Sequence, residues 1–177
     1  NLIPRFYDTV SGKVLVDGVD VRQWSLESLR HKIGYVPQKP VLFSGSIEDN
    51  LRYGRETATV SELTKAAEIS QASDFISEFE NGYTHQIAQG GTNLSGGQKQ
   101  RLSIARALVR NPEIYLFDDS FSALDFKTDA RLRAALKPVT REATVILVAQ
   151  RVGTVMDADR IIVMNEGKVA GIGTHSE

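Results

Sequence analysis

The sequence contains no cysteine, which excludes disulfide bonds and zinc sites with cysteine ligands. It also lacks a long hydrophobic run, since stretches such as residues 144–149 have only the length of a strand. A membrane span requires about 20 apolar residues. No signal pattern is visible at the N-terminus, and a reducing cytosolic compartment is compatible with the composition.

Excess charge of one sign is also missing, with 21 Lys and Arg against 22 Asp and Glu and no basic block. This balance argues against a nucleic-acid surface, where Lys and Arg usually cluster in excess. What is present is ordinary globular composition, with 41% hydrophobic and 24% charged residues in a chain of 177. A chain of this length can bury one good core.

Residues 93–101, Asn-Leu-Ser-Gly-Gly-Gln-Lys-Gln-Arg, join a glycine-rich turn to a helical run that ends at Asn111-Pro112. Gly96 and Gly97 let backbone N–H groups approach an anion, and Ser95 offers a hydroxyl. The partly positive N-terminus of the helix points at the same place. The segment thus predicts a phosphate site, although such a turn alone is more often a flexible loop or a helix N-cap.

Two carboxylates follow a short apolar stretch further along the chain. Residues 114–117, Ile-Tyr-Leu-Phe, predict a buried strand that delivers Asp118 and Asp119. Nucleotide-hydrolysing α/β proteins place a magnesium ligand beside a catalytic or water-orienting acid in this way. The alternative is an acidic pair that caps a following helix.

These segments together resemble a known family. Residues 94–101, 116–119 and 122–125 are similar to the signature, Walker B and D-loop motifs of the ATP-binding-cassette (ABC) ATPases, in the same order and at the expected spacing. Residues 34–38 resemble the strand and glutamine of the Q-loop, and residues 42–51 resemble the segment that follows it in exporters. The resemblance covers essentially the whole chain.

The resemblance implies ATP and Mg²⁺ as cofactors and assigns roles to individual residues. Gln38 would offer its amide oxygen to magnesium or to the attacking water, and Asp118 would hold magnesium directly or through water. Asp125 would sit at the interface of two nucleotide-binding domains, although a plain N-cap is its alternative. The residues that the resemblance assigns to nucleotide or metal are Gln38, Leu94, Ser95, Gly96, Gly97, Gln98, Asp118 and Asp125.

Two positions depart from the family pattern. Asp119 stands where hydrolysing members have a glutamate that polarises the lytic water, and Gln150 stands where they have a switch histidine. A general base must come within about 2.6 to 3.2 Å of its proton donor, and the shorter aspartate retracts the carboxylate by roughly one C–C bond. Glutamine can hydrogen-bond a phosphate but cannot take up positive charge. We therefore expect Asp119 and Gln150 to form a slow catalytic site.

Such a pair of changes resembles one half of a heterodimeric exporter. The resemblance then implies two partners: a second nucleotide-binding domain, from a different chain with the consensus Walker B glutamate and switch histidine, and the transmembrane domains of the transporter. No nucleic-acid partner is expected. Location would be the cytoplasmic face of the cell (inner) membrane, through the transmembrane domain. The alternatives are a purely regulatory nucleotide-holding module and a soluble ABC ATPase of repair or translation.

The phosphate-binding pattern G-x-x-x-x-G-K-[ST] does not occur in these 177 residues. Its backbone cradle and lysine grip the β- and γ-phosphates in the proteins that carry it. We therefore expect the sequence to be part of a longer polypeptide whose upstream part carries this loop (Walker A) and a membrane domain. Alone, these residues should bind ATP poorly and be inactive.

Alternating strands and helices predict an α/β fold, a P-loop NTPase core with a mainly parallel sheet flanked by helices. Residues 1–38 and 108–177 would form this core, and residues 39–107 an ABC-type helical subdomain, with Gln38 at the junction as a hinge. We expect strands at residues 13–17, 33–37, 114–117, 144–149, 160–164 and 168–172, belonging to one sheet. We expect helices at residues 26–31, 60–69, 73–79, 127–136 and 151–157, and one that follows the glycine-rich turn and is stopped by Asn111-Pro112.

Overall fold

The computed structural model describes all 177 residues and contains a three-stranded parallel sheet at its centre. The strands are β3 (Ile33–Val36), β6 (Ile114–Asp118) and β7 (Thr144–Val148), in the order β3-β6-β7. The middle strand, β6, is a nearly continuous apolar run with three buried residues, which is typical of a parallel strand covered on both faces. The α/β fold with a mainly parallel sheet is confirmed.

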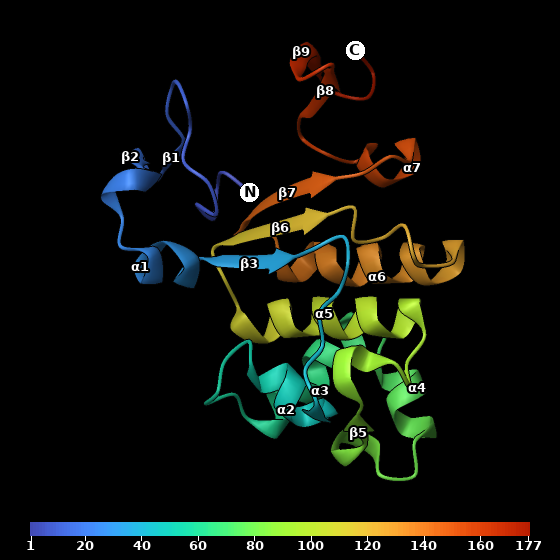
Figure 1. Cartoon of the computed structure of the whole chain (residues 1–177). Coiled ribbons are helices and arrows are strands. Elements are labelled where there is room, and N and C mark those ends of the chain that lie inside the picture. Colours follow the sequence, from blue (N-terminus) through green and yellow to red (C-terminus); the bar gives the residue numbers. More distant parts are fainter.

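Helices cover one face of the sheet in layers (Figure 1). The long helices α5 (Gly96–Arg110) and α6 (Phe126–Val139) lie nearest the sheet, and α5 contacts β3. Beyond α5 lie α2 (Ile47–Arg52), α3 (Val60–Ile69) and α4 (Ser73–Glu78). One core of 25 buried residues runs through the sheet, α5 and this outer helical layer. The division into a core and a helical subdomain stays a prediction.

The remaining elements are short. They are α1 (Leu26–His31), α7 (Val152–Val155) and 3-10 helices at Val21–Gln23, Gly82–Thr84 and Gln89–Gly91. A small antiparallel pair, β4 (Gly45–Ser46) with β5 (Gln86–Ile87), joins two loops of the helical layer and was not predicted from the sequence. The longest helix, α5, has 15 residues, and none of the helices combines the length and hydropathy needed to cross a bilayer.

Six strands do not join the parallel sheet. For the three of them that were predicted, at residues 13–17, 160–164 and 168–172, the expectation of a single sheet was wrong. β1 (Leu15–Val16) pairs with β2 (Val19–Asp20), and β8 (Ile161–Asn165) pairs with β9 (Lys168–Gly173), both antiparallel. Their connections, Asp17-Gly18 and Glu166-Gly167, have positive φ at both residues (52° and 76°, 47° and 74°). Two-residue turns with left-handed backbone match the twist of antiparallel strands, so each strand pairs with its chain neighbour.

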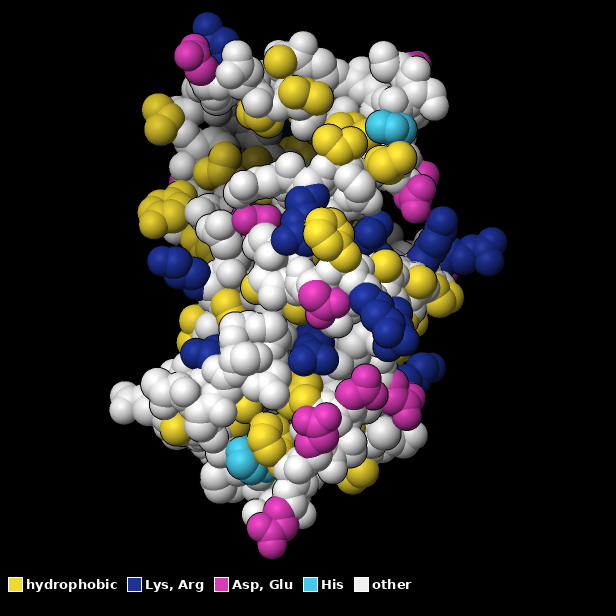
Figure 2. All heavy atoms as spheres, turned by 90° about the vertical axis from the view of Figure 1, so that its right-hand side faces the viewer, with side chains coloured by type: hydrophobic (Ala, Val, Ile, Leu, Met, Phe, Trp, Pro, Cys, Tyr) yellow, Lys and Arg dark blue, Asp and Glu magenta, His cyan; other side chains and the backbone are white.

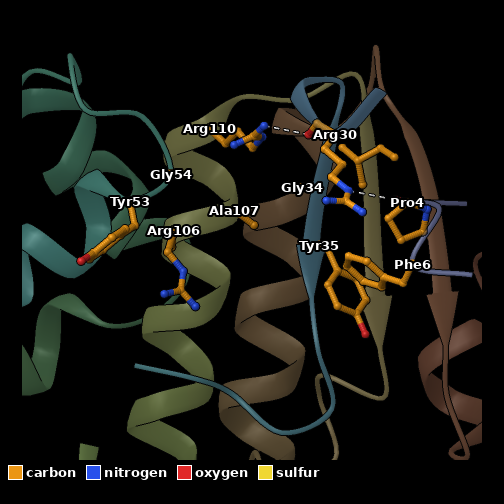
Figure 3. Close-up of a pocket in the computed structure, with 11 residues that line it drawn as sticks. Pro4, Phe6, Arg30, Gly34, Tyr35, Tyr53, Gly54, Arg106, Ala107 and Arg110 are labelled. Carbon is orange, nitrogen blue, oxygen red and sulfur yellow. Dashed lines mark hydrogen bonds between the residues drawn. The ribbon is translucent and has the colours of Figure 1, made fainter. Parts of the chain in front are cut away.

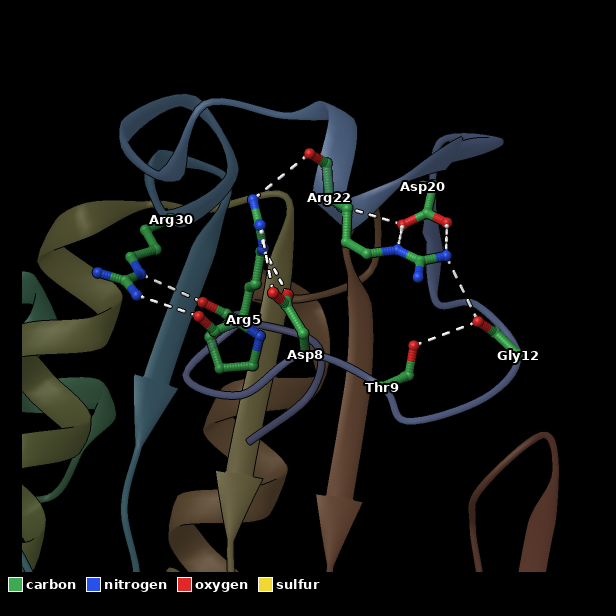
Figure 4. Close-up of polar contacts among 8 residues, drawn as sticks. Arg5, Asp8, Thr9, Gly12, Asp20, Arg22 and Arg30 are labelled. Carbon is green, nitrogen blue, oxygen red and sulfur yellow. Dashed lines mark hydrogen bonds and ion pairs between the residues drawn. The ribbon is translucent and has the colours of Figure 1, made fainter.

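Polar contacts fasten the N-terminal segment to the rest of the chain (Figure 4). The guanidinium of Arg30, on α1, donates to the carbonyl oxygens of Pro4 and Arg5, each at 3.2 Å. Arg5 in turn pairs with Asp8 at 2.7 Å. Because Arg30 lies just before β3, these contacts place the first residues beside the sheet.

Hydrophobic side chains remain exposed around β7 and the C-terminal hairpin. Figure 2 looks onto the side of the molecule where the sheet strands end, and yellow hydrophobic side chains are visible at its top, in the region of α7, β8 and β9. The exposed large hydrophobic residues of these elements are Val145, Ile146, Val148, Val152, Ile162, Val163, Met164, Val169 and Ile172. This face is therefore incompletely covered by the 177 residues.

Candidate active site

The three parallel strands end at one edge of the sheet, on the right in Figure 1, and each delivers a predicted site residue there. Gln38 follows β3, Asp118 ends β6 with Asp119 directly after it, and Gln150 follows β7. The carboxyl ends of parallel strands are where α/β proteins bind ligands. Four residues chosen from separate motifs thus meet at one site, although the first and the last, Gln38 and Gln150, are 112 positions apart in the chain.

Asp119 stands at the centre of this group. Its Oδ2 accepts a hydrogen bond from Nε2 of Gln38 at 3.1 Å and another from Nε2 of Gln150 at 3.2 Å. The backbone of Asp119 is left-handed, with φ of 48°, and its N–H donates to the carbonyl of Val148 at 2.9 Å. We call Gln38, Asp119 and Gln150 the amide clamp.

Asp118 has a partner that the sequence did not reveal. The hydroxyl of Tyr35, on β3, donates to Oδ2 of Asp118 at 3.3 Å. Burial, followed by the nearby charge of Asp118, raises the pKa of Tyr35 above its ordinary value of 10.0. Tyr35 pairs in register with Leu116, so its long side chain reaches two residues forward along the neighbouring strand. Only the register of β3 and β6 could have indicated this contact.

The glycine-rich turn begins α5 with a capping box. The Oγ of Ser95 accepts from the N–H of Gln98 at 3.2 Å, and Oε1 of Gln98 accepts from the N–H of Ser95 at 2.8 Å. The helix N-cap, left open as the alternative for this turn, is therefore a role of Ser95. Leu94 is buried among the core residues, so its side chain packs and does not face a ligand.

Gly96 and Gly97 are the first two residues of α5, and neither has positive φ. A Cβ at Gly96 would meet no atom within 4 Å. At Gly97 it would meet Ala123 O at 3.5 Å and Leu124 Cδ2 at 3.8 Å, which are ordinary contacts. Glycine costs a helix up to about 1 kcal/mol relative to alanine. Nothing within the chain explains these two glycines, so the space above them suits something outside it.

The D-loop lies between the signature turn and the amide clamp. Asp125 caps α6, with its two carboxylate oxygens accepting from the N–H (2.9 Å) and the hydroxyl (2.7 Å) of Thr128. These hydrogen bonds hold the pKa of Asp125 below its ordinary value. Arg151, next to Gln150, donates to the carbonyl of Ser122 at 3.0 Å. Asp125 is thus an N-cap, and its further role at a domain interface stays a prediction.

The donor atoms at this edge fit magnesium. Mg²⁺ takes oxygen ligands, usually one or two carboxylates completed by waters and substrate phosphates. The Asp118 carboxylate and the Gln38 amide oxygen are of this kind, and no group of three or more His, Cys, Asp or Glu offers a rival site. The predicted Mg²⁺ contacts of Gln38 and Asp118 are therefore chemically reasonable, although the loop that grips the β- and γ-phosphates is not among these residues.

A larger pocket of about 230 Å³ lies elsewhere, between α1, the end of α2 and α5 (Figure 3). It is lined by the guanidinium-bearing residues Arg30, Arg106 and Arg110, and no acidic residue lines it. Burial lowers the pKa of Arg106 and of Arg110, and Nε of Arg110 is buried without a hydrogen-bond partner. None of the predicted site residues borders this pocket, although Gly34 and Tyr35, from the segment that resembles the Q-loop, line it.

An α/β chain whose parallel strands bring an acidic pair and two glutamines to one edge, beside a helix led by two glycines, belongs to the class of nucleotide-binding domains. The sequence model of the family described as "ABC transporter" matches residues 1–122. Since this is more than half of the chain, the protein belongs to the ABC transporter family.

Known proteins agree with this assignment. An ABC transporter ATP-binding protein of Mycobacterium bovis is 49% identical over 99% of the chain, which spans 30% of that relative. A Staphylococcus aureus protein, provisionally named a multidrug export ATP-binding/permease protein, is 43% identical over the whole chain, which spans 31% of it. A solved bacterial Atm1-family ABC exporter with ATP bound superposes with a TM-score of 0.95 at 40% identity, over 99% of this chain and 31% of that one. The predicted exporter-type nucleotide-binding domain is confirmed, and the chain spans about a third of these proteins.

Proposed function

We propose that this chain is the ATP-binding domain of an exporter, that its own catalytic site is slow, and that its signature turn completes the site of a second nucleotide-binding domain. The observation that carries the proposal is the amide clamp, in which the acidic residue of the site is a short aspartate held by two neutral side chains. Similarity to exporters supports the transport role.

At the chain's own site, Asp118 and Gln38 present oxygen atoms to magnesium, and Tyr35 orients the Asp118 carboxylate. Bound Mg²⁺ would supply positive charge to phosphate oxygens. Asp119 stands one methylene short of the glutamate that the family uses, and a displacement of about 1 Å can cost ~10²-fold in rate. Gln150 donates a hydrogen bond but stays neutral at every pH. These residues favour holding nucleotide over hydrolysing it.

The signature turn serves another site in this proposal. Gly96 and Gly97 open α5, where the first backbone N–H groups have no partner within the helix and a phosphate is stabilised. Since no residue of the chain requires glycine there, the arrangement supports a nucleotide that arrives on a partner domain. The partner domain would carry the consensus glutamate and histidine.

The pocket lined by Arg30, Arg106 and Arg110, which we call the arginine pocket, is our candidate contact with the membrane domain. Tyr53 and Phe43 beside it are exposed at 61% and 44%, and its three guanidinium groups lack an acidic neighbour among the lining residues. Aromatic and arginine side chains are enriched in protein interfaces. This surface would transmit movement of the domain to the membrane part, at the cytoplasmic face of the membrane.

The experiment is a comparison of ATP turnover by Asp119→Glu, Gln150→His and the double variant in the intact protein with its partner. Asp119→Glu alone should raise turnover little, because the neutral amide of Gln150 still occupies the place of the switch histidine. The double variant should raise it clearly. A full gain from Asp119→Glu alone, or no gain from the double variant, would contradict the proposal.

A purely regulatory module that never turns over ATP at its own site is the second candidate, favoured by the same clamp. Hydrolysis in a single turnover, with the partner's site disabled, separates the two. The 177 residues alone should bind ATP poorly, and tight binding in calorimetry would show that the phosphate cradle is not needed.

A further inference from the structure

The amide clamp uses the Asp119 carboxylate in an unusual way, because both glutamine amides share one oxygen, Oδ2. We propose that Asp119 is a positioning residue that aims the side chains of Gln38 and Gln150, and does not act as the base that activates water. The inference rests on the proposed function, since it concerns the same Mg²⁺-nucleotide site. The aspartate side chain, although one methylene shorter than glutamate, is long enough for Oδ2 to reach both amides.

An amide side chain has two nearly isosteric ends, an oxygen that accepts and a nitrogen that donates. Rotation by 180° exchanges them, and only the oxygen end is a ligand for magnesium. A carboxylate accepts hydrogen bonds but cannot donate them, so Asp119 selects the orientation in which Nε2 of Gln38 faces it. Oε1 of Gln38 then points away from Asp119 and has no hydrogen-bond partner in the chain. Gln150 is oriented in the same manner.

The backbone holds this anchor in place. The N–H of Asp119 is bonded to Val148 of β7, and its carbonyl accepts from the hydroxyl of Ser122 at 2.9 Å. The left-handed φ of 48° is tolerated by aspartate, asparagine and glycine better than by other residues. The carboxylate position is therefore set by the β6–β7 pairing and by the D-loop, and not by the two glutamines alone.

The geometry also provides a sharp set of variants. Oδ1 of Asp119 has no hydrogen-bond partner in the chain, so Asp119→Asn can keep an acceptor oxygen on both amides and place its NH₂ where no donor opposes it. Asp119→Gly removes the side chain without straining the left-handed backbone. Asparagine thus preserves the anchor and destroys the base, whereas glycine destroys both.

The test is the affinity for Mn²⁺, measured by electron paramagnetic resonance on the intact protein loaded with a non-hydrolysable ATP analogue, with the partner's site disabled. Asp119→Asn should stay within about twofold of the parent, and Asp119→Gly should weaken Mn²⁺ binding about fivefold, the effect of one exposed hydrogen bond. Gln38→Ala should weaken it similarly in the parent and add little in Asp119→Gly. Asp118→Asn, which removes the proposed direct ligand, is the positive control.

The inference is overturned if Asp119→Asn binds Mn²⁺ as weakly as Asp119→Gly, or if Gln38→Ala has the same effect in both backgrounds. It is also overturned if both Asp119 variants lose own-site turnover equally while Mn²⁺ affinity is unchanged, the pattern of a base. Thermal unfolding of each variant identifies any loss of fold, and the glycine variant guards against backbone strain. Rapid turnover at the parent's own site would refute the proposed function, yet would leave the Mn²⁺ comparison readable.

Discussion

Replacing either signature glycine by alanine should stabilise the domain and remove most ATP hydrolysis at the same time. Gly96 and Gly97 lie in the first turn of α5, where a Cβ meets nothing within 4 Å at Gly96 and only ordinary contacts at 3.5 and 3.8 Å at Gly97. Alanine in a helix is favoured over glycine by up to about 1 kcal/mol, which shifts the unfolding midpoint of a domain of this size by about 2–4 °C. The added methyl group nevertheless occupies the space proposed for a phosphate.

The assay pairs thermal unfolding with steady-state ATPase activity of the intact protein and its partner. Gly153→Ala is the matched control, because Gly153 also lies in a helix, α7, and has no atom within 4 Å of an added Cβ. It should raise stability in the same way and leave ATPase activity unchanged. Normal ATPase activity in both Gly96→Ala and Gly97→Ala would refute the reasoning, and so would a clear loss of stability.

The remaining predictions concern a helix cap and a partly buried tyrosine. Ser95→Ala should cost about 1 kcal/mol of stability as a lost N-cap and should also remove most ATPase activity. Ser46→Ala, which breaks an equivalent capping box at the start of α2, should cost a similar amount of stability and leave the ATPase activity unchanged. Equal ATPase losses in the two variants would show that the cap alone explains Ser95. Tyr35→Phe should weaken Mn²⁺ binding a few-fold by freeing Asp118, and an unchanged affinity would exclude a positioning role for Tyr35. The pKa of Tyr35 is raised on folding, so its contribution to stability is present below pH 10 and is lost as the pH rises through the folded pKa. Tyr35→Phe should therefore lose less stability at alkaline pH than the parent, as measured by unfolding at a series of pH values. Some alkaline loss should remain, because the pKa of Tyr115 is also raised.

Much of the sheet could be predicted because its strands are apolar runs that end at polar residues. Residues 114–118 form the central strand, one residue longer than the expected 114–117, and the helix over residues 60–69 matches its predicted bounds. Pairing of the last two strands could not be derived from such runs, since it depends on a left-handed turn at Glu166-Gly167. The turn at Asp17-Gly18 is also left-handed, but it could have been predicted, because Asp-Gly is a favoured sequence for a two-residue hairpin turn.

The candidate site was predictable as a set of residues but not as a geometry. Strand-end position alone brought Gln38, Asp118, Asp119 and Gln150 to one edge. The sharing of one Asp119 oxygen by two amides depends on side-chain lengths and on a left-handed backbone, which no motif expresses. Tyr35 was missed for a related reason, since its contact crosses between two strands and requires their register.

Asymmetry between the two nucleotide sites is the central claim, and single-turnover hydrolysis at this chain's own site tests it most directly. The partner's Walker B glutamate is replaced by glutamine in the intact protein, and the hydrolysis of stoichiometric ATP at the remaining site is followed over time. Measured against the converse assembly, in which Asp118→Asn removes the proposed magnesium ligand and leaves only the partner's site, hydrolysis at this chain's site should be about 10²-fold slower. Equal rates in the two assemblies would contradict the account.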